Sequence, residues 1–239
     1  PLSVPFTVLW IVGITNAVNL IDGLDGLANG VSAISATTML VIALLASEGE
    51  VALVMAALVG ACVGFMPYNL NPAKMFMGDT GATFLGYILA TMSIQGLFKF
   101  YAVISFAVPF LILGLPIFDT AFAFIRRIAH GQSPMHADRG HIHHRLIDMG
   151  LNQKQAVATL YVISAMLGLS AVVLTTGGEQ KAMLFFLALC IVAAVAARVV
   201  FPKEIREELH EEIEELRELG HHGEHPERKE APGRGDKEG

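Results

Sequence analysis

The sequence predicts an all-α protein, a polytopic bundle of membrane-spanning helices. Hydrophobic residues make up 54% of the 239 residues and charged residues only 16%, and the mean hydropathy is +0.56. These values lie on the membrane side of ordinary globular composition. A span needs about 20 mostly apolar residues, and about seven stretches approach that length: 2–18, 30–46, 51–67, 82–98, 101–124, 156–176 and 181–201. A soluble domain with so many apolar runs would lack the polar surface to cover itself.

Polar or glycine-rich segments separate these runs and set the limits of the expected helices. The fifth run contains Pro109 and Pro116, which fall on roughly the same side of it and are expected to kink it. Cys62 and Cys190 both lie inside expected spans and share no metal-ligand spacing with each other or with histidine. We expect them to be small buried apolar residues rather than a disulfide.

The charge of the chain is concentrated near its end. Of the 22 acidic and 16 basic residues, 13 and 7 come after Phe201, so residues 1–201 carry nine of each and the net charge of −6 belongs to residues 202–239. We expect a membrane domain at 1–201 and a charged cytoplasmic tail at 202–239. Apolar residues at helical spacing predict a short amphipathic helix at 203–219, which could pair with a second copy in a homodimer, and the mixture after Gly220 predicts disorder. No basic stripe indicates a nucleic-acid partner.

Loop charge predicts which side of the membrane carries the long loops. With alternating spans, one side receives residues 18–29, 68–81, 125–155 and the tail, and the other receives 47–50, 99–100 and 177–180. The first side holds nearly all of the loop lysines and arginines, so the positive-inside rule places it in the cytoplasm. This arrangement is typical of an enzyme at the inner membrane surface, whereas a transporter more often places its polar groups at mid-membrane.

Asn19, Asp22 and Asp25 form the most informative segment, because carboxylates near hydrocarbon are costly and are functional by default. Their spacing of three residues puts them on one face of a helical turn. Clustered carboxylates and amides suit Mg²⁺, which takes one or two carboxylates together with substrate phosphate oxygens. The alternative is a polar helix cap interrupted by glycines.

A second loop, residues 69–82, contains Lys74 and a Gly-Asp-Thr-Gly sequence around Asp79, where a helix is expected to begin. A helix N-terminus with free amide groups binds phosphate readily. Asp79 adds a metal ligand, and Lys74 adds a positive charge. The alternative is that Asp79 only caps the helix.

A third loop, residues 126–145, is rich in histidine and arginine. Three interpretations are open. A zinc site would want cysteines, which are absent here. A positive juxtamembrane loop would bind lipid headgroups, and a pocket for a diphosphate substrate would use the same side chains as donors. Asp119 precedes this loop, and an ion pair with Arg126 or Arg127, or a buried polar contact, is for it at least as good an interpretation as catalysis.

Three motifs in order within residues 1–155 resemble those of the polyprenyl-phosphate N-acetylhexosamine-1-phosphate transferases, glycosyltransferase family 4. They are Asn-Ala-Val-Asn-Leu-Ile-Asp-Gly-Leu-Asp-Gly-Leu-Ala at 16–28, Phe-Met-Gly-Asp-Thr-Gly at 76–81 and Asp-Arg-Gly-His-Ile-His-His-Arg-Leu at 138–146. The His-Ile-His-His sequence favours the undecaprenyl-phosphate GlcNAc-1-phosphate transferase branch over the phospho-MurNAc-pentapeptide translocase branch.

The resemblance implies an Mg²⁺-dependent enzyme, with Mn²⁺ as a substitute cation. It would transfer a sugar 1-phosphate, GlcNAc-1-phosphate in this branch, from a UDP-N-acetylhexosamine to undecaprenyl phosphate. UMP would be released at the cytoplasmic face of a bacterial or archaeal plasma membrane, which starts a cell-surface glycan such as teichoic acid or lipopolysaccharide. The implied catalytic residues are Asp22, Asp25 and Asp79, with Asp79 as metal ligand. The implied substrate-binding residues are Asn19, Lys74, Phe76, Arg139, His141, His143 and His144, with Phe76 stacking on uracil.

One motif of that family is missing. No Asp-Asp pair occurs in the chain, although the family carries one on an earlier cytoplasmic loop, and related proteins have further helices before the first one here. We therefore expect an N-terminally truncated chain that is inactive alone. Two other functions stay open at this stage. One is a polytopic transporter that uses Asp22, Asp25 and Asp119 as an ion path, and the other is a catalytically inactive relative that binds lipid or nucleotide.

Overall fold

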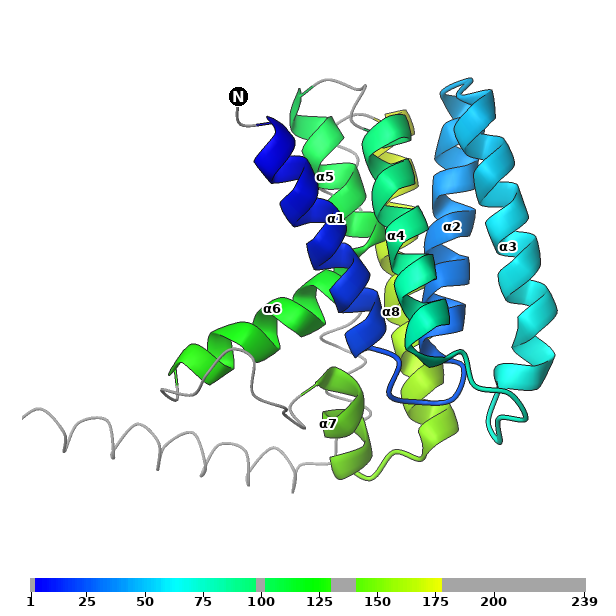
Figure 1. Cartoon of the computed structure of the whole chain (residues 1–239), viewed down its shortest axis with the longest axis vertical. Coiled ribbons are helices and arrows are strands. Elements are labelled where there is room, and N and C mark those ends of the chain that lie inside the picture. The colour runs from blue at the N-terminus through cyan, green and yellow to red at the C-terminus, as the bar shows by residue number, and fades with distance from the viewer. Residues whose placement is uncertain (1–2, 98–101, 130–140, 178–239) are drawn as a thin grey trace, which may run out of the picture. The chain divides into compact units, whose positions relative to one another are not determined.

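The computed structural model describes residues 3–97, 102–129 and 141–177, all of which belong to one compact unit. Every regular element in these described ranges is an α-helix (Figure 1). The helices are α1 (Ser3–Leu20), α2 (Leu27–Leu45), α3 (Gly49–Asn69), α4 (Gly78–Leu97), α5 (Ala102–Ile112), α6 (Gly114–Ala129), α7 (Ile142–Asp148) and α8 (Gln153–Gly177). The all-α prediction is confirmed, while the predicted boundary at residue 201 and the tail helix lie outside the described residues.

Four of the described helices, α1, α2, α3 and α8, are long and apolar enough to cross a membrane. This agrees with the prediction of a bundle of membrane-length apolar helices, but the count of seven spans is not confirmed. α4 occupies the fourth expected run without reaching the same hydropathy, and the fifth run is divided between α5 and α6. The seventh run, residues 181–201, lies outside the described residues.

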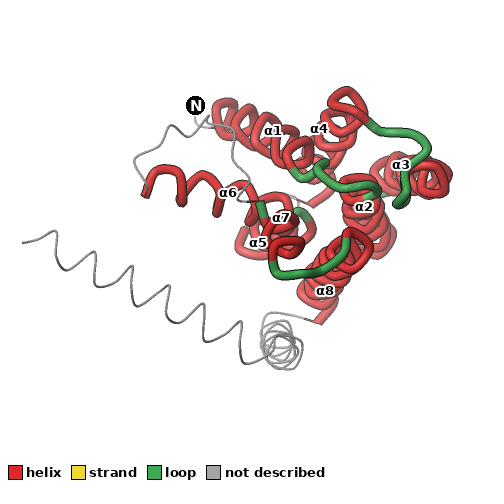
Figure 2. The backbone as a smooth tube through the Cα atoms, turned by 90° about the horizontal axis from the view of Figure 1, so that it is seen from below, coloured by secondary structure: helices red, strands yellow, loops and turns green. Residues whose placement is uncertain are grey.

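α2 lies among α3, α4 and α8 (Figure 2). It packs against these three helices. In its most apolar stretch of 18 residues 72% is buried, compared with 22% for α1 and 33% for α8. Ala28 and Ala36 on α2 have no exposed surface. Such small residues let neighbouring helices approach closely, as is typical of helix packing in membranes. α1 lies beside α4.

Two buried polar side chains join α2 to its neighbours. Asn29 donates from Nδ2 to the carbonyl oxygen of Cys62 on α3, at 3.1 Å, and Ser35 donates from Oγ to the carbonyl oxygen of Ile112 on α5, at 2.9 Å. Hydrogen bonds of this kind satisfy polar groups that water cannot reach. Cys62 is a free, buried thiol, in agreement with the sequence, and Cys190 lies outside the described residues.

The predicted kink near Pro109 and Pro116 is a complete break between two helices. α5 ends at Ile112 and α6 begins at Gly114, which places Pro116 in the first turn, where a helix does not need its missing N–H. α6 then leaves the bundle at an angle (Figure 1). One face of α6 buries Asp119 and Ala123, and the other exposes large apolar side chains. These are Phe118, Phe122, Phe124, Ile125 and Ile128.

A separate apolar cluster, here called the site-end core, joins the lower parts of several helices. It brings together the loop after α1, the first turns of α2 and α6, helix α7 and the first half of α8. Its buried members are Ile21, Leu27, Ala28, Val31, Leu115, Leu146, Ala156, Val157 and Leu160. This core fixes the polar loops at that end of the bundle relative to one another, because the same buried side chains touch several of them.

Tyr161 of α8 packs directly on the first turn of α2. Its hydroxyl group donates to the carbonyl oxygen of Gly26, at 2.5 Å, and its ring occupies the space where a Cβ atom of Gly30 would lie. Gly26 also has a φ of 80°, in the left-handed region that favours glycine. The glycines of this segment therefore serve a close helix contact and a turn, as well as any role in ligand approach.

We expect Gly30→Ala to lower the thermal unfolding temperature of the purified protein in detergent. The added methyl group would meet the Tyr161 ring, and overpacking of this kind costs about 1–3 kcal/mol. Gly60→Ala on α3 is the matched control, because no atom lies within 4 Å of its added Cβ and alanine is the better helix former. Equal melting temperatures for the two variants would contradict the proposed contact.

Candidate functional site

Three polar segments predicted to share one side of the membrane lie at the same end of the bundle (Figure 1). They are the loop 21–26 between α1 and α2, the loop 70–77 between α3 and α4, and the short helix α7. The short connection between α2 and α3 lies at the opposite end. The polar groups thus gather at the edge of the apolar bundle and outside its middle.

Asp22 and Asp79 influence each other across two of these segments. Asp22 follows α1 and is partly buried, while Asp79 is exposed in the first turn of α4. Burial, and after it the negative charge of Asp79, raise the pKa of the Asp22 carboxyl group. Two carboxylates that repel each other at one site suit a bound cation, which removes the repulsion.

The polar groups around Asp22 fit a hard divalent cation with few protein ligands. Asn19, whose carbonyl oxygen accepts from the N–H of Asp22, has a buried Oδ1 atom with no hydrogen-bond partner. Among the described residues, no three His, Cys, Asp or Glu side chains gather as a complete metal cluster. A cation held by Asp22 and Asp79 would therefore need water or substrate oxygens as further ligands, which is the usual situation of Mg²⁺.

Asp25 braces the two loops against each other. Its Oδ2 atom accepts from Nδ2 of Asn71, at 2.9 Å, and from the backbone N–H of Ala73, at 3.1 Å. Asn71 also donates to Oε1 of Gln153 at the start of α8, at 2.8 Å. The loop that leads to Asp79 is thereby tied to the loop that carries Asp22. The sequence did not indicate this use of Asp25, because it depends on residues 46 and 48 positions away.

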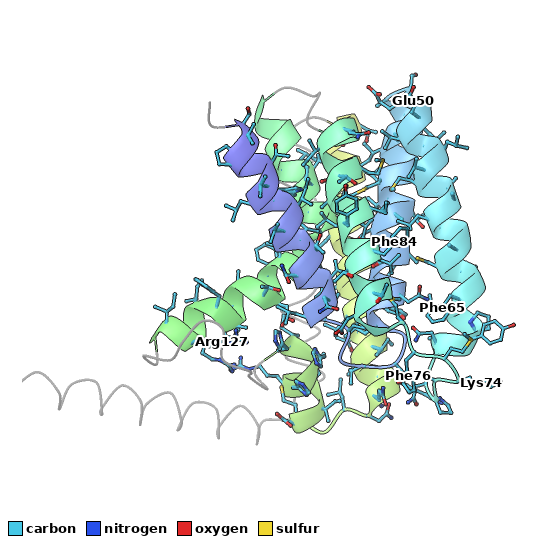
Figure 3. All side chains as sticks on the ribbon, in the orientation of Figure 1. Glu50, Phe65, Lys74, Phe76, Phe84 and Arg127 are labelled. Carbon is cyan, nitrogen blue, oxygen red and sulfur yellow. The ribbon has the colours of Figure 1, made fainter. Side chains whose placement is uncertain are left out.

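Phe76 and Lys74 lie on the outer side of the loop before α4 (Figure 3). The Phe76 side chain is 78% exposed and borders an open, apolar groove of about 260 Å³ between α3 and α4. Phe65 and Phe84 line the same groove. The Lys74 side chain is exposed, and its backbone N–H donates to the carbonyl oxygen of Tyr68, at 2.7 Å. An exposed ring beside Asp79 is available for stacking on a planar ligand.

The three predicted histidines differ in accessibility. His141 and His143 are buried, with 6% and 2% exposed, whereas His144 is partly exposed. The ring of His143 lies against Gly23, directly after Asp22, and its Nε2 atom has no hydrogen-bond partner. Burial, followed by the charge of His144, lowers the pKa of His143 to about 4, so its imidazole is neutral at pH 7. Arg139, the remaining predicted residue of this loop, lies outside the described residues.

Asp119 makes a buried polar contact, which was one of the alternatives that the sequence left open. Its Oδ2 atom lies 2.9 Å from Nδ1 of His141, and the side chain is 2% exposed. The sequence signal for this residue was a single carboxylate in an otherwise apolar run, which marks a buried polar partner without naming it.

Sequence comparison with known proteins identifies relatives of this chain. Residues 1–97 match the sequence profile described as glycosyl transferase family 4. The chain is 46% identical over 200 residues to a probable undecaprenyl-phosphate N-acetylglucosaminyl 1-phosphate transferase of Bacillus subtilis, which covers 83% of this chain and 55% of that protein. The chain therefore spans little more than half of this relative.

Two further relatives match shorter stretches. A decaprenyl-phosphate N-acetylglucosaminephosphotransferase of Mycolicibacterium smegmatis is 35% identical over 122 residues, which is 46% of this chain and 30% of that protein. A phospho-N-acetylmuramoyl-pentapeptide-transferase of Staphylococcus aureus is 40% identical over 98 residues, which is 40% of this chain and 30% of that protein. All three relatives are thus named as transferases. Two of the names contain a polyprenyl phosphate, and the third contains a phospho-N-acetylmuramoyl group.

We expect the thermal stability of the protein to decrease as the pH is lowered from 6.5 to 4. In that range the unfolded chain protonates His143 near its ordinary pKa of 6.5, but the folded chain protonates it only near 4. The unfolded state then binds more protons and is favoured at low pH. At about 1.4 kcal/mol per pH unit, this amounts to on the order of 3 kcal/mol.

Melting temperatures in detergent at several pH values would measure this effect. His143→Gln is expected to remove the His143 part of the decrease. His144→Gln is expected to keep most of it, because burial is the larger cause of the shift at His143. The same pH dependence in His143→Gln and in the unaltered protein would contradict the assignment.

Proposed function

The chain belongs to glycosyl transferase family 4, and on that premise we propose that it transfers a sugar 1-phosphate from a UDP-sugar to a polyprenyl phosphate. GlcNAc-1-phosphate is the proposed group, and undecaprenyl phosphate is the proposed acceptor, by analogy with the name of the Bacillus subtilis relative. The observation that carries the proposal is the convergence of Asp22, Asp79 and His143 at one end of an apolar helical bundle. At that position a water-soluble nucleotide and a lipid-bound phosphate can meet.

The proposed reaction is a phosphoryl transfer between two anions. An oxygen of the lipid phosphate bonds to the phosphorus next to the sugar. The bond from that phosphorus to the bridging oxygen breaks, and UMP leaves with the bonding electrons. A divalent cation, Mg²⁺ by preference, supplies charge neutralisation for the diphosphate. The protein contributes Asp22 and Asp79 to hold the cation and His143 as a neutral group beside them, and the chemistry requires chiefly such positioning and electrostatic stabilisation.

The charge distribution supports a cytoplasmic location for this end of the bundle. Among the described residues it carries Lys74, Arg126, Arg127, Arg145 and Lys154, and the connection at the opposite end carries Glu48 and Glu50 (Figure 3). The positive-inside rule assigns the positively charged end to the cytoplasm. UDP-sugars are soluble substrates, so the proposed location also matches the substrate.

A transporter is the less favoured function. An ion path expects carboxylates at mid-membrane depth, lining a cavity or facing a broken helix. Asp22 and Asp79 lie instead at the end of the bundle, and Asp119 is occupied by α7. The relatives are also named as transferases.

We expect Asp79→Asn to lower the rate of UMP release on the order of 100-fold or more, because it removes one of two carboxylates proposed to hold the cation. The assay uses the full-length gene product, together with UDP-GlcNAc, undecaprenyl phosphate and Mg²⁺. Glu50→Gln is the matched control, since Glu50 is an exposed carboxylate at the opposite end (Figure 3). A chelator should abolish release in the unaltered protein, and unchanged turnover of Asp79→Asn would disprove the assignment.

We expect Phe76→Ala to raise the KM for UDP-GlcNAc about tenfold with a smaller effect on kcat, because stacking of a base on an aromatic ring contributes about 1–3 kcal/mol. Phe84→Ala is the control, since Phe84 lines the same groove from within α4 and not from the loop 70–77 that carries Phe76. Steady-state kinetics with varied UDP-GlcNAc measures both. An equal rise of KM in the two variants would indicate a general disturbance of the groove instead of base stacking.

A further inference from the structure

Asp119 uses both carboxylate oxygens to hold the start of α7. Oδ1 accepts from the backbone N–H of Ile142, at 2.7 Å, and Oδ2 pairs with Nδ1 of His141, at 2.9 Å. Since an ionised carboxylate can only accept, Nδ1 of His141 is the donor in the second bond. The carboxylate belongs to α6 and reaches 22 and 23 positions along the chain. It thus connects the helix that leaves the bundle to the histidine segment.

The position of α7 depends on contacts from outside this helix. α7 has seven residues, and its N-cap residue His141 makes no capping hydrogen bond with its own side chain. Isolated helices of this length are unstable in water. Asp119 supplies an acceptor for the N–H of Ile142, one of the N–H groups in the first turn that have no partner within the helix. Further contacts come from Leu146 in the site-end core and from Arg145, an exposed residue whose guanidinium group lies 5.0 Å from the centre of the Phe122 ring.

The contact at Asp119 continues into the carboxylate loop. The rings of His141 and His143 stack nearly parallel, with centroids 5.8 Å apart and an angle of 8°. The far edge of His143 lies against Gly23, the residue after Asp22. A shift of His141 would therefore move His143 relative to Asp22. Asp119 itself is 2% exposed, and each of its two oxygens already takes part in a hydrogen bond with the start of α7.

We propose that Asp119 is a positioning residue for the transfer reaction: it acts through His141 to hold His143 against Gly23 beside Asp22, without touching the substrate. The kinetic part of this inference rests on the proposed function. The structural part, the attachment of α7 to α6, does not. The two parts are tested by different measurements.

Hydrogen exchange tests the attachment without any substrate. In Asp119→Ala, peptides that cover α7 should exchange at least about tenfold faster than in the unaltered protein, while peptides from α2 stay unchanged. Asp119→Asn keeps an oxygen that can accept from the Ile142 N–H. Its exchange rate in α7 should therefore lie between those of Asp119→Ala and the unaltered protein. Asp148→Ala is the matched control, because it removes an exposed carboxylate from α7 itself. Unchanged exchange of α7 in Asp119→Ala overturns the inference, whatever the activity of the enzyme.

A double-mutant cycle tests whether Asp119 acts through His141. We expect Asp119→Ala and His141→Ala each to lower kcat/KM for UDP-GlcNAc on the order of 100-fold, since small misplacements at an active site have effects of that size. The double variant should have the same kcat/KM as the more impaired single variant, because both substitutions break the same connection between Asp119 and His141. Asp148→Ala should retain the original kcat/KM.

The outcomes separate the two proposals. Losses that multiply in the double variant overturn the action through His141. If the unaltered protein releases no UMP, the proposed function is overturned. Faster exchange of α7 in Asp119→Ala would in that case still support the attachment of α7 by Asp119. Faster exchange together with a non-additive cycle supports both.

Discussion

The approach of α8 to the first turn of α2 is the contact on which the rest of the site depends. Gly30 leaves the space that the Tyr161 ring fills, and Tyr161 holds the carbonyl group of Gly26, where the chain turns with a positive φ into α2. The loop with Asp22 and Asp25 is thereby fixed to α8. Because α7 precedes α8 by only a few residues and shares the site-end core with it, the histidine segment is positioned by the same contact.

These contacts hold two carboxylates, Asp22 and Asp79, in an electrostatically unfavourable arrangement. Asp22 is partly buried and feels the charge of Asp79, so both effects raise its pKa and disfavour its ionised form. Flexible loops would relax such a repulsion by moving apart. Here Asp25, through Asn71 and Ala73, ties the two loops together. A divalent cation held by both carboxylates would relieve this repulsion.

The sequence predicted those parts of the structure that depend on local patterns. The apolar runs gave α1 to α4 and α8 within a few residues, and the loop charges and motifs placed Asp22, Asp79 and the histidines at one end. Long-range contacts escaped it. The partner of Asp119 lies 22 residues away, and Asp25 accepts a hydrogen bond from Asn71, 46 residues away. The prolines marked the region between α5 and α6 as a kink, but the direction of α6 depends on its packing partners, which no local pattern contains.

The direction of α6 gives the Asp119 contact a further consequence. α6 exposes an apolar face that includes Phe118 and Phe122, next to the side chain of Asp119 on its buried face. A helix with one strongly apolar face at the end of a membrane bundle lies in the interface between hydrocarbon and water. Asp119 therefore joins α7 to the helix that carries this exposed apolar face, while the site-end core joins α7 to the bundle. The histidine segment is thus held from two sides, by Asp119 of α6 and by the site-end core, and this accounts for a carboxylate in an otherwise apolar helix.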